Sequence, residues 1–183
     1  TPTVAISGWV NTLAATVDKV SRTTAAGVYA AGDCTGVLML ASVAAMQGRI
    51  AMWHALGEAV QPLRLDTVSA TVFTDPEIAA VGVSQADIES GAVVATTIKL
   101  ALATNARAKM QGITDGFVKL YARPGSGTIL GGVVVAPRAS ELILSVALAV
   151  QHGITAEQFA HTFSIYPSLS GSLTEAARQL MRR

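Results

Sequence analysis

Residues 23–49 read Thr-Thr-Ala-Ala-Gly-Val-Tyr-Ala-Ala-Gly-Asp-Cys-Thr-Gly-Val-Leu-Met-Leu-Ala-Ser-Val-Ala-Ala-Met-Gln-Gly-Arg, and they carry the clearest structural signal in the first part of the chain. They predict a short apolar strand over residues 28–31, a turn at Gly32-Asp33 and a helix over residues 39–56. A carboxylate at the carboxyl end of a strand can accept hydrogen bonds from ribose or polyol hydroxyls, and the start of a helix favours negative charge. The order of these elements therefore favours a nucleotide-cofactor site, whereas a lone Gly-Asp pair would indicate only a turn.

The predicted helix carries small side chains at helical spacing. Ala41, Ala44, Ala45 and Gly48 recur at i, i+3, i+4 and i+7, which predicts a face for close packing. A glycine inside a helix costs up to about 1 kcal/mol relative to alanine. We therefore expect Gly48 to face a backbone segment or a ligand.

The composition is that of an ordinary, rather apolar globular protein. The 183 residues are 51% hydrophobic and 14% charged, which suffices for one sizeable core or two small ones. A net charge of +1 without a basic stripe argues against nucleic acid as a partner. The apolar runs are shorter than the roughly 20 residues that a bilayer crossing needs, so we predict no membrane span.

Cysteine and histidine usage limits the possible chemistry. Cys34 is the only cysteine, which excludes an internal disulfide and fits a reducing compartment, so we expect a cytoplasmic protein in which Cys34 is a small buried filler. The three histidines show no metal-binding spacing, so we predict no metal site. The first residues lack an initiating Met and a signal sequence, and we expect the chain to be a fragment.

Gln61-Pro62-Leu63-Arg64 interrupts the helical pattern and predicts a boundary between domains over residues 1–63 and 64–183. The second domain reads as strands followed by helices, with turn residues at 124–127 that predict an antiparallel hairpin. The predicted strands cover residues 67–73, 78–83, 93–102, 116–122 and 128–135. Predicted helix starts lie at Ser84, Ser140, Thr155-x-x-Gln158 and Ser172-x-x-Glu175. This order predicts an α+β fold, a mainly antiparallel sheet with helices on one side.

The first stretch resembles the second FAD-binding fingerprint of the pyridine nucleotide-disulfide oxidoreductases. The matching residues are Thr23, Val28, Tyr29, Ala30, Gly32 and Asp33. The resemblance implies that Asp33, which follows Gly32, holds a ribitol hydroxyl of the flavin. It also implies that the backbone amides around Leu40 and Ala41 face the pyrimidine edge of the isoalloxazine.

Later motifs resemble the carboxy-terminal interface domain of the same family and follow in its order. They cover residues 73–82, 105–108, 115–120, Gly131-Gly132, Glu141 and residues 166–170. The resemblance implies that residues 1–63 are the C-terminal remnant of an FAD-binding α/β domain. Residues 64–183 would then form a complete dimerisation domain of a homodimer.

Two positions depart from the family members that reduce disulfides, which carry a histidine and a glutamate near the end of the chain. Tyr166 stands in the histidine position and Gly171 in the glutamate position. An imidazole exchanges protons near neutral pH, whereas a phenol does so only near pH 10. We therefore predict no catalytic residue in this chain, and we interpret His161 as a surface residue rather than a substitute base. Tyr166 would stack at the flavin edge or pack in the interface, and the resemblance implies that its backbone carbonyl reaches the flavin of the partner subunit.

These observations predict the C-terminal part of a homodimeric flavoprotein oxidoreductase that transfers electrons from NAD(P)H through FAD to a quinone-like acceptor. One alternative is a lipoamide dehydrogenase-like disulfide reductase with an unusual base. Another is a dimerisation module that is inactive in isolation. We expect weak or absent FAD retention by this chain alone, because most cofactor contacts of the family lie in segments that this sequence lacks.

Overall fold

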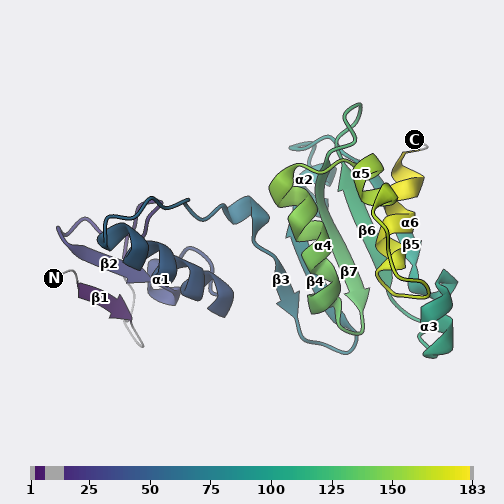
Figure 1. Cartoon of the computed structure of the whole chain (residues 1–183), viewed down its shortest axis with the longest axis horizontal. Helices are drawn as coiled ribbons and strands as arrows, with labels where there is room; N and C mark the ends of the chain where they lie inside the picture. The colour runs from purple at the N-terminus through teal and green to yellow at the C-terminus, as the bar shows by residue number, and fades with distance from the viewer. Residues whose placement is uncertain (1–2, 7–14, 182–183) are drawn as a thin grey trace. The chain divides into compact units, whose positions relative to one another are not determined.

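The computed structural model describes residues 3–6 and 15–181. It divides into two compact units, Thr1–Leu65 and Asp66–Arg183 (Figure 1). The boundary predicted between residues 63 and 64 lies two residues from this division.

The first unit contains two parallel strands and one long helix. Strand β1 (Thr3–Ile6) pairs in parallel with β2 (Val28–Ala31). A short 3-10 helix, η1 (Asp33–Thr35), follows β2 and leads toward α1 (Ala41–Ala55), the long blue helix of Figure 1. The strand lies where it was predicted, and the helix begins two residues later than predicted and ends one residue earlier.

The buried face of α1 differs from the predicted one. The residues that α1 buries are Val43, Gln47, Ile50 and Ala51. A methyl group added at Gly48 would meet no atom within 4 Å among the described residues, so the expected backbone contact there is wrong. Ala44 does approach another segment closely, because a Cβ built on Gly32 would lie 3.3 Å from the Ala44 Cβ.

The second unit is a five-stranded antiparallel sheet in the order β3-β4-β7-β6-β5. The strands are β3 (Ala70–Val72), β4 (Glu77–Gly82), β5 (Thr96–Ala101), β6 (Phe117–Ala122) and β7 (Ile129–Ala136). Strands β6 and β7 form the predicted hairpin. The strand predicted over residues 67–73 is shorter, because a 3-10 turn, η2 (Leu65–Thr67), occupies its start.

Helices cover one face of this sheet, so the predicted α+β class is confirmed (Figure 1). They are α4 (Ala139–His152), α5 (Ala156–His161) and α6 (Gly171–Leu180), while α2 (Gln85–Glu89), η3 (Leu102–Thr104) and α3 (Ala106–Met110) lie in the connections. The core lies between sheet and helices and includes Val118, Leu120, Val134, Ile143, Val146 and Ala177. None of the helices that the structure describes is both long and apolar enough to cross a membrane.

Two of the predicted helix caps are present and two are not. Ser84 and Asp87 form a capping box on α2, and Thr155 and Gln158 form one on α5. Helix α4 begins after Arg138 rather than with Ser140 as its cap.

The capping box predicted at the start of the last helix is wrong. Helix α6 begins at Gly171, which places Ser172 inside its first turn, where the side chain is buried and bonded to another segment. Glu175 bonds to Arg178 and Gln179 on its own helix instead of capping it.

Candidate functional site

The turn after β2 requires a glycine. Gly32 adopts φ 88° and ψ −157°, a backbone conformation that residues with a side chain rarely adopt. Its lack of a side chain also lets the turn lie against Ala44 in the first part of α1. Asp33 follows immediately, with an exposed side chain at the start of η1.

A buried hydrogen-bond network holds this turn. The Gly32 amide donates to Oε1 of Gln47 at 2.8 Å, and Nε2 of Gln47 donates to the Thr35 hydroxyl at 3.3 Å. The Thr35 hydroxyl donates in turn to the Gly32 carbonyl at 2.7 Å. Gln47 is 5% exposed and Thr35 8% exposed, so water hardly competes for these bonds. Neither residue was predicted from the sequence, although a glutamine between apolar helix positions was a signal.

The Asp33 carboxylate accepts no hydrogen bond from the part of the chain that the structure describes. The start of α1 offers hydrogen-bond donors instead of an acceptor. Leu40 occupies the N-cap position without a side-chain cap, and no acidic residue lies in the first turn that begins at Ala41. The Leu40 amide itself donates to the Leu38 carbonyl at 2.9 Å, so the expectation that it faces a ligand is not met, and the open donors begin at Ala41. The first amides of a helix and its dipole favour electron-rich groups. This unit therefore offers a hydrogen-bond acceptor, which suits the hydroxyl groups of a polyol, and a set of donors, which suits the polar edge of a heterocyclic ring attached to it.

A second contact ties the other end of α1 to the strand. The Tyr29 hydroxyl lies 2.7 Å from Nδ1 of His54, in the last turn of the helix.

Cys34 is only half-buried, and its thiol donates to the Ala31 carbonyl at 3.4 Å, so it is less enclosed than predicted.

Tyr166 lies in the second unit, on the connection between α5 and α6. Its side chain is 84% exposed, and those of Phe163 and Ile165 are 95% and 77% exposed. Three large apolar or aromatic side chains thus lie in water on one short segment. This is unusual for a connection, because such residues are normally buried.

Asn105 holds the far end of this connection. Its Oδ1 accepts from the Arg107 and Ala108 amides and caps α3. Its Nδ2 donates to the Ser168 carbonyl at 3.0 Å and to the Ser172 hydroxyl at 2.8 Å. Through Asn105, the start of α3 is therefore also tethered to the segment that carries Tyr166.

The positions of Tyr166 and Gly171 offer no acid-base pair. Gly171 is the first residue of α6 and contributes no side chain. His161 is exposed at the end of α5, as predicted, and its Nδ1 lies 2.9 Å from the Glu157 carbonyl. The described residues bring no three His, Cys, Asp or Glu side chains together in a way that could hold a metal.

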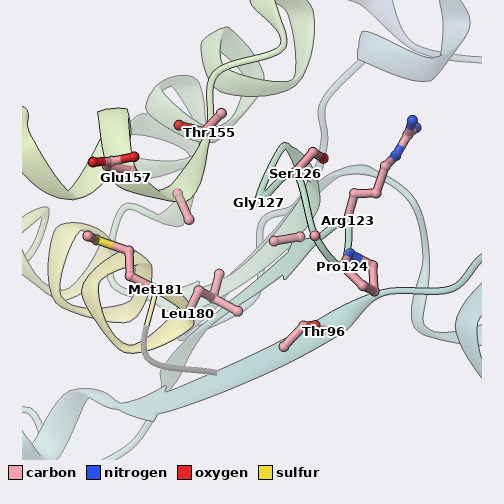
Figure 2. Close-up of a pocket in the computed structure, with 12 residues that line it drawn as sticks. Thr96, Arg123, Pro124, Ser126, Gly127, Thr155, Glu157, Leu180 and Met181 are labelled. Atoms are coloured by element: carbon pink, nitrogen blue, oxygen red, sulfur yellow. The ribbon is translucent and has the colours of Figure 1, made fainter.

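A cavity of about 530 Å³ lies elsewhere in the second unit, at the tip of the β6–β7 hairpin (Figure 2). Thr96, Arg123, Ser126, Thr155 and Glu157 are among the residues that line it. In Figure 2 the Arg123 side chain extends away from Glu157, and the cavity contains none of the predicted flavin-site residues. The cavity is therefore not part of the predicted flavin site.

The comparison with protein families identifies the second unit. Residues 68–177 match the pyridine nucleotide-disulphide oxidoreductase dimerisation domain. This range covers the whole antiparallel sheet and most of the helices packed on it. The matched domain is therefore the one in which Tyr166 and Asn105 lie.

Known proteins resemble nearly the whole chain. A Mycobacterium tuberculosis protein named NAD(P)H dehydrogenase (quinone) is 68% identical over 166 residues, which are 91% of this chain and 34% of that protein. The dihydrolipoyl dehydrogenase of Haloferax volcanii is 38% identical over 168 residues, 90% of this chain and 35% of that protein. The crystal structure of LpdA from Mycobacterium tuberculosis has 67% identity and a TM-score of 0.88 over 91% of this chain and 36% of LpdA. The chain thus spans about a third of the length of these relatives.

Proposed function

This chain belongs to the pyridine nucleotide-disulphide oxidoreductase family, and from that membership we propose that it is the C-terminal part of a homodimeric flavoprotein that passes electrons from NAD(P)H to a quinone-like acceptor. The main support comes from Tyr166 and Gly171. Tyr166 presents an exposed phenol where thiol chemistry needs a base, and Gly171 has no side chain where that chemistry needs the partner of the base. The name of the Mycobacterium tuberculosis relative, NAD(P)H dehydrogenase (quinone), points to the same acceptor.

The first unit fits FAD as the cofactor. The Asp33 carboxylate, which accepts no hydrogen bond from the described residues, would accept one from a ribitol hydroxyl. The amides from Ala41 onward, at the uncapped start of α1, would face the pyrimidine edge of the flavin and favour negative charge there, while the Leu40 amide donates to the Leu38 carbonyl. FAD held there would supply the hydride and electron transfer between NAD(P)H and the acceptor.

We infer a homodimer from the same family membership. The matched dimerisation domain spans residues 68–177, and the exposed side chains of Phe163, Ile165 and Tyr166 lie within it. Apolar groups of this size gain by burial in a subunit interface. The Tyr166 side chain would pack there or against the flavin edge, and its backbone carbonyl would reach the flavin of the partner subunit.

The acceptor is tested on the protein expressed at its full natural length. NADH and NADPH oxidation are measured with a benzoquinone, with lipoamide and with oxidised glutathione. We expect the quinone to be reduced fastest, because it needs no thiolate and no imidazole. Faster reduction of either disulfide would refute the quinone assignment.

The cofactor site is tested separately from the acceptor. Asp33→Ala should lower the affinity of the apoprotein for FAD, whereas Asp18→Ala, which removes an exposed carboxylate paired with Arg22, should not. Equal FAD affinity in Asp33→Ala and the unsubstituted protein would refute the flavin site.

A disulfide reductase is the second candidate, since the Haloferax volcanii relative is a dihydrolipoyl dehydrogenase. It would need a base that the described residues do not supply near Tyr166. A dimerisation module that is inactive in isolation is the third candidate. The cytoplasmic location stays a prediction.

A further inference from the structure

We propose that Gln47 is a positioning residue for the flavin site and sets the affinity for FAD by fixing the orientation of the peptide group between Gly32 and Asp33. This inference rests on the proposed function, because it assumes that Asp33 contacts the flavin. It concerns a residue on α1 whose own side chain is buried, with both ends of its amide bonded within the turn.

The amide of Gln47 uses both of its ends. Its oxygen accepts from the Gly32 amide at 2.8 Å, and its nitrogen donates to the Thr35 hydroxyl at 3.3 Å. The Thr35 hydroxyl then donates to the Gly32 carbonyl at 2.7 Å. Side chains thus hold both polar groups of Gly32, one directly and one through Thr35.

The Gly32 carbonyl and the Asp33 amide belong to one planar peptide group. The Thr35 hydroxyl and the Thr35 backbone amide both donate to that carbonyl, at 2.7 and 2.9 Å, and Gln47 holds the hydroxyl, so the plane cannot rotate without breaking hydrogen bonds of this network. Rotation is otherwise easy at this point, since glycine has the widest choice of backbone conformations. The network therefore fixes the direction in which the Asp33 side chain leaves the backbone.

A buried glutamine at this position lowers the stability of the fold unless its hydrogen bonds compensate for the lost bonds to water. An amide buried in a helix–strand contact loses its bonds to water, and an apolar side chain would fill the same volume without that loss. Gln47 instead satisfies a backbone amide next to the one exposed carboxylate of the turn. A hydrogen bond between a carboxylate and a hydroxyl tolerates only small errors in distance and angle, so the placement of Asp33 affects affinity directly.

The test measures FAD dissociation constants by flavin fluorescence in the apoprotein expressed at its full natural length. Gln47→Met keeps the length of the side chain and removes both bonds. Thr35→Val keeps the shape of Thr35 and removes its hydroxyl, whereas Thr35→Ser keeps the hydroxyl. Tyr29→Phe is the matched control, because it removes the polar contact between the Tyr29 hydroxyl of β2 and His54 at the far end of α1 and leaves the bonds of Gln47 in place.

We expect Gln47→Met and Thr35→Val to raise the dissociation constant about tenfold, the effect of losing one well-placed hydrogen bond. Thr35→Ser and Tyr29→Phe should stay within about twofold of the unsubstituted protein. The absorption spectrum of the bound flavin should also shift in Gln47→Met, because the contact at Asp33 changes.

Three results would overturn the inference. Unchanged affinity in Gln47→Met, with weakened affinity in Asp33→Ala, would leave the flavin site in place and remove Gln47 from it. Equal weakening in Tyr29→Phe would mean that any loosening of α1 has this effect. Unchanged affinity in Asp33→Ala would refute the proposed flavin site and with it the role of Gln47. If Gln47→Met does not fold, Thr35→Val decides on the same criteria.

Discussion

Glu77, the first residue of β4, accepts two hydrogen bonds from Ser140, the second residue of α4, at 2.9 Å from its amide nitrogen and 2.7 Å from its hydroxyl. Helix α4 has no side-chain cap of its own, because Arg138 precedes it in a left-handed conformation with φ 61°. A strand residue 63 positions earlier in the chain therefore satisfies the start of the helix.

Acid should weaken this link. The bonds from the Ser140 amide and hydroxyl, helped by the charge of Arg138, lower the pKa of Glu77 below its usual value. A carboxyl group whose pKa is lower in the folded than in the unfolded chain stabilises the fold above the unfolded pKa. That contribution is lost as the pH falls through the folded pKa. Glu77→Gln should therefore lower the unfolding midpoint at pH 7, and the difference from the unsubstituted protein should shrink below about pH 4.

Glu141→Gln is the control for this experiment. Glu141 lies in the same first turn of α4, is exposed, and accepts no bond from the backbone amides that the structure describes at the helix start. Urea unfolding at pH 7, 5 and 3 compares the two variants. If both lose the same stability at pH 7, the charge of the first turn matters and the bond to Ser140 does not.

Replacement of Asn105 should loosen the segment that carries Tyr166. Asn105→Ala removes the cap of α3 and leaves the buried Ser172 hydroxyl without its donor, for a loss of about 2–3 kcal/mol. Asn105→Asp keeps the capping oxygen and loses only the donor to Ser168 and Ser172. Hydrogen exchange at residues 168–172 should rise in both variants. Unchanged exchange in Asn105→Asp would show that the tether does not hold this segment.

Restoring an imidazole should not restore disulfide chemistry. Tyr166→His changes a side chain that is 84% exposed, so the stability of this chain should change by less than about 0.5 kcal/mol. Reduction of lipoamide by the protein at its full natural length should stay at background, because Gly171 supplies no carboxylate to orient the new ring. Rapid lipoamide reduction by Tyr166→His alone would contradict this.

The same substitution at two glycines should act in opposite directions. A Cβ at Gly132 would lie 2.7 Å from the Lys119 carbonyl and 3.1 Å from Val146 Cγ1, so Gly132→Ala should cost about 1–3 kcal/mol. The new methyl group of Gly48→Ala, in the middle of α1, meets none of the described residues of other segments within 4 Å, so the substitution should stabilise the first unit by about 0.5–1 kcal/mol. Thermal unfolding followed by circular dichroism measures both. Destabilisation by Gly48→Ala would mean that another part of the protein covers this surface.

The local predictions succeeded where a few neighbouring residues decide the outcome. The capping boxes at Ser84 and Thr155 join residues three positions apart, the turn at residues 124–127 is marked by its own proline and glycines, and the strand at Val28–Ala31 by its own apolar run. The capping box predicted at Ser172 failed for the opposite reason. Its hydroxyl is bonded to Asn105, 67 positions away, and the helix begins one residue earlier.

The α+β class, the order of the elements and the family could all be predicted from the amino-acid sequence, because periodicity, turn residues and motif spacing are local properties of the chain. Sequence alone could not predict the hydrogen-bond partners of Gln47, Asn105 and Glu77. A polar side chain can bond to any backbone group that the fold brings within about 3 Å, and that choice is made by the packing of distant segments. The buried hydrogen bonds that hold the turn at Asp33 therefore depend on the packing of α1 against β2, which only the tertiary structure decides.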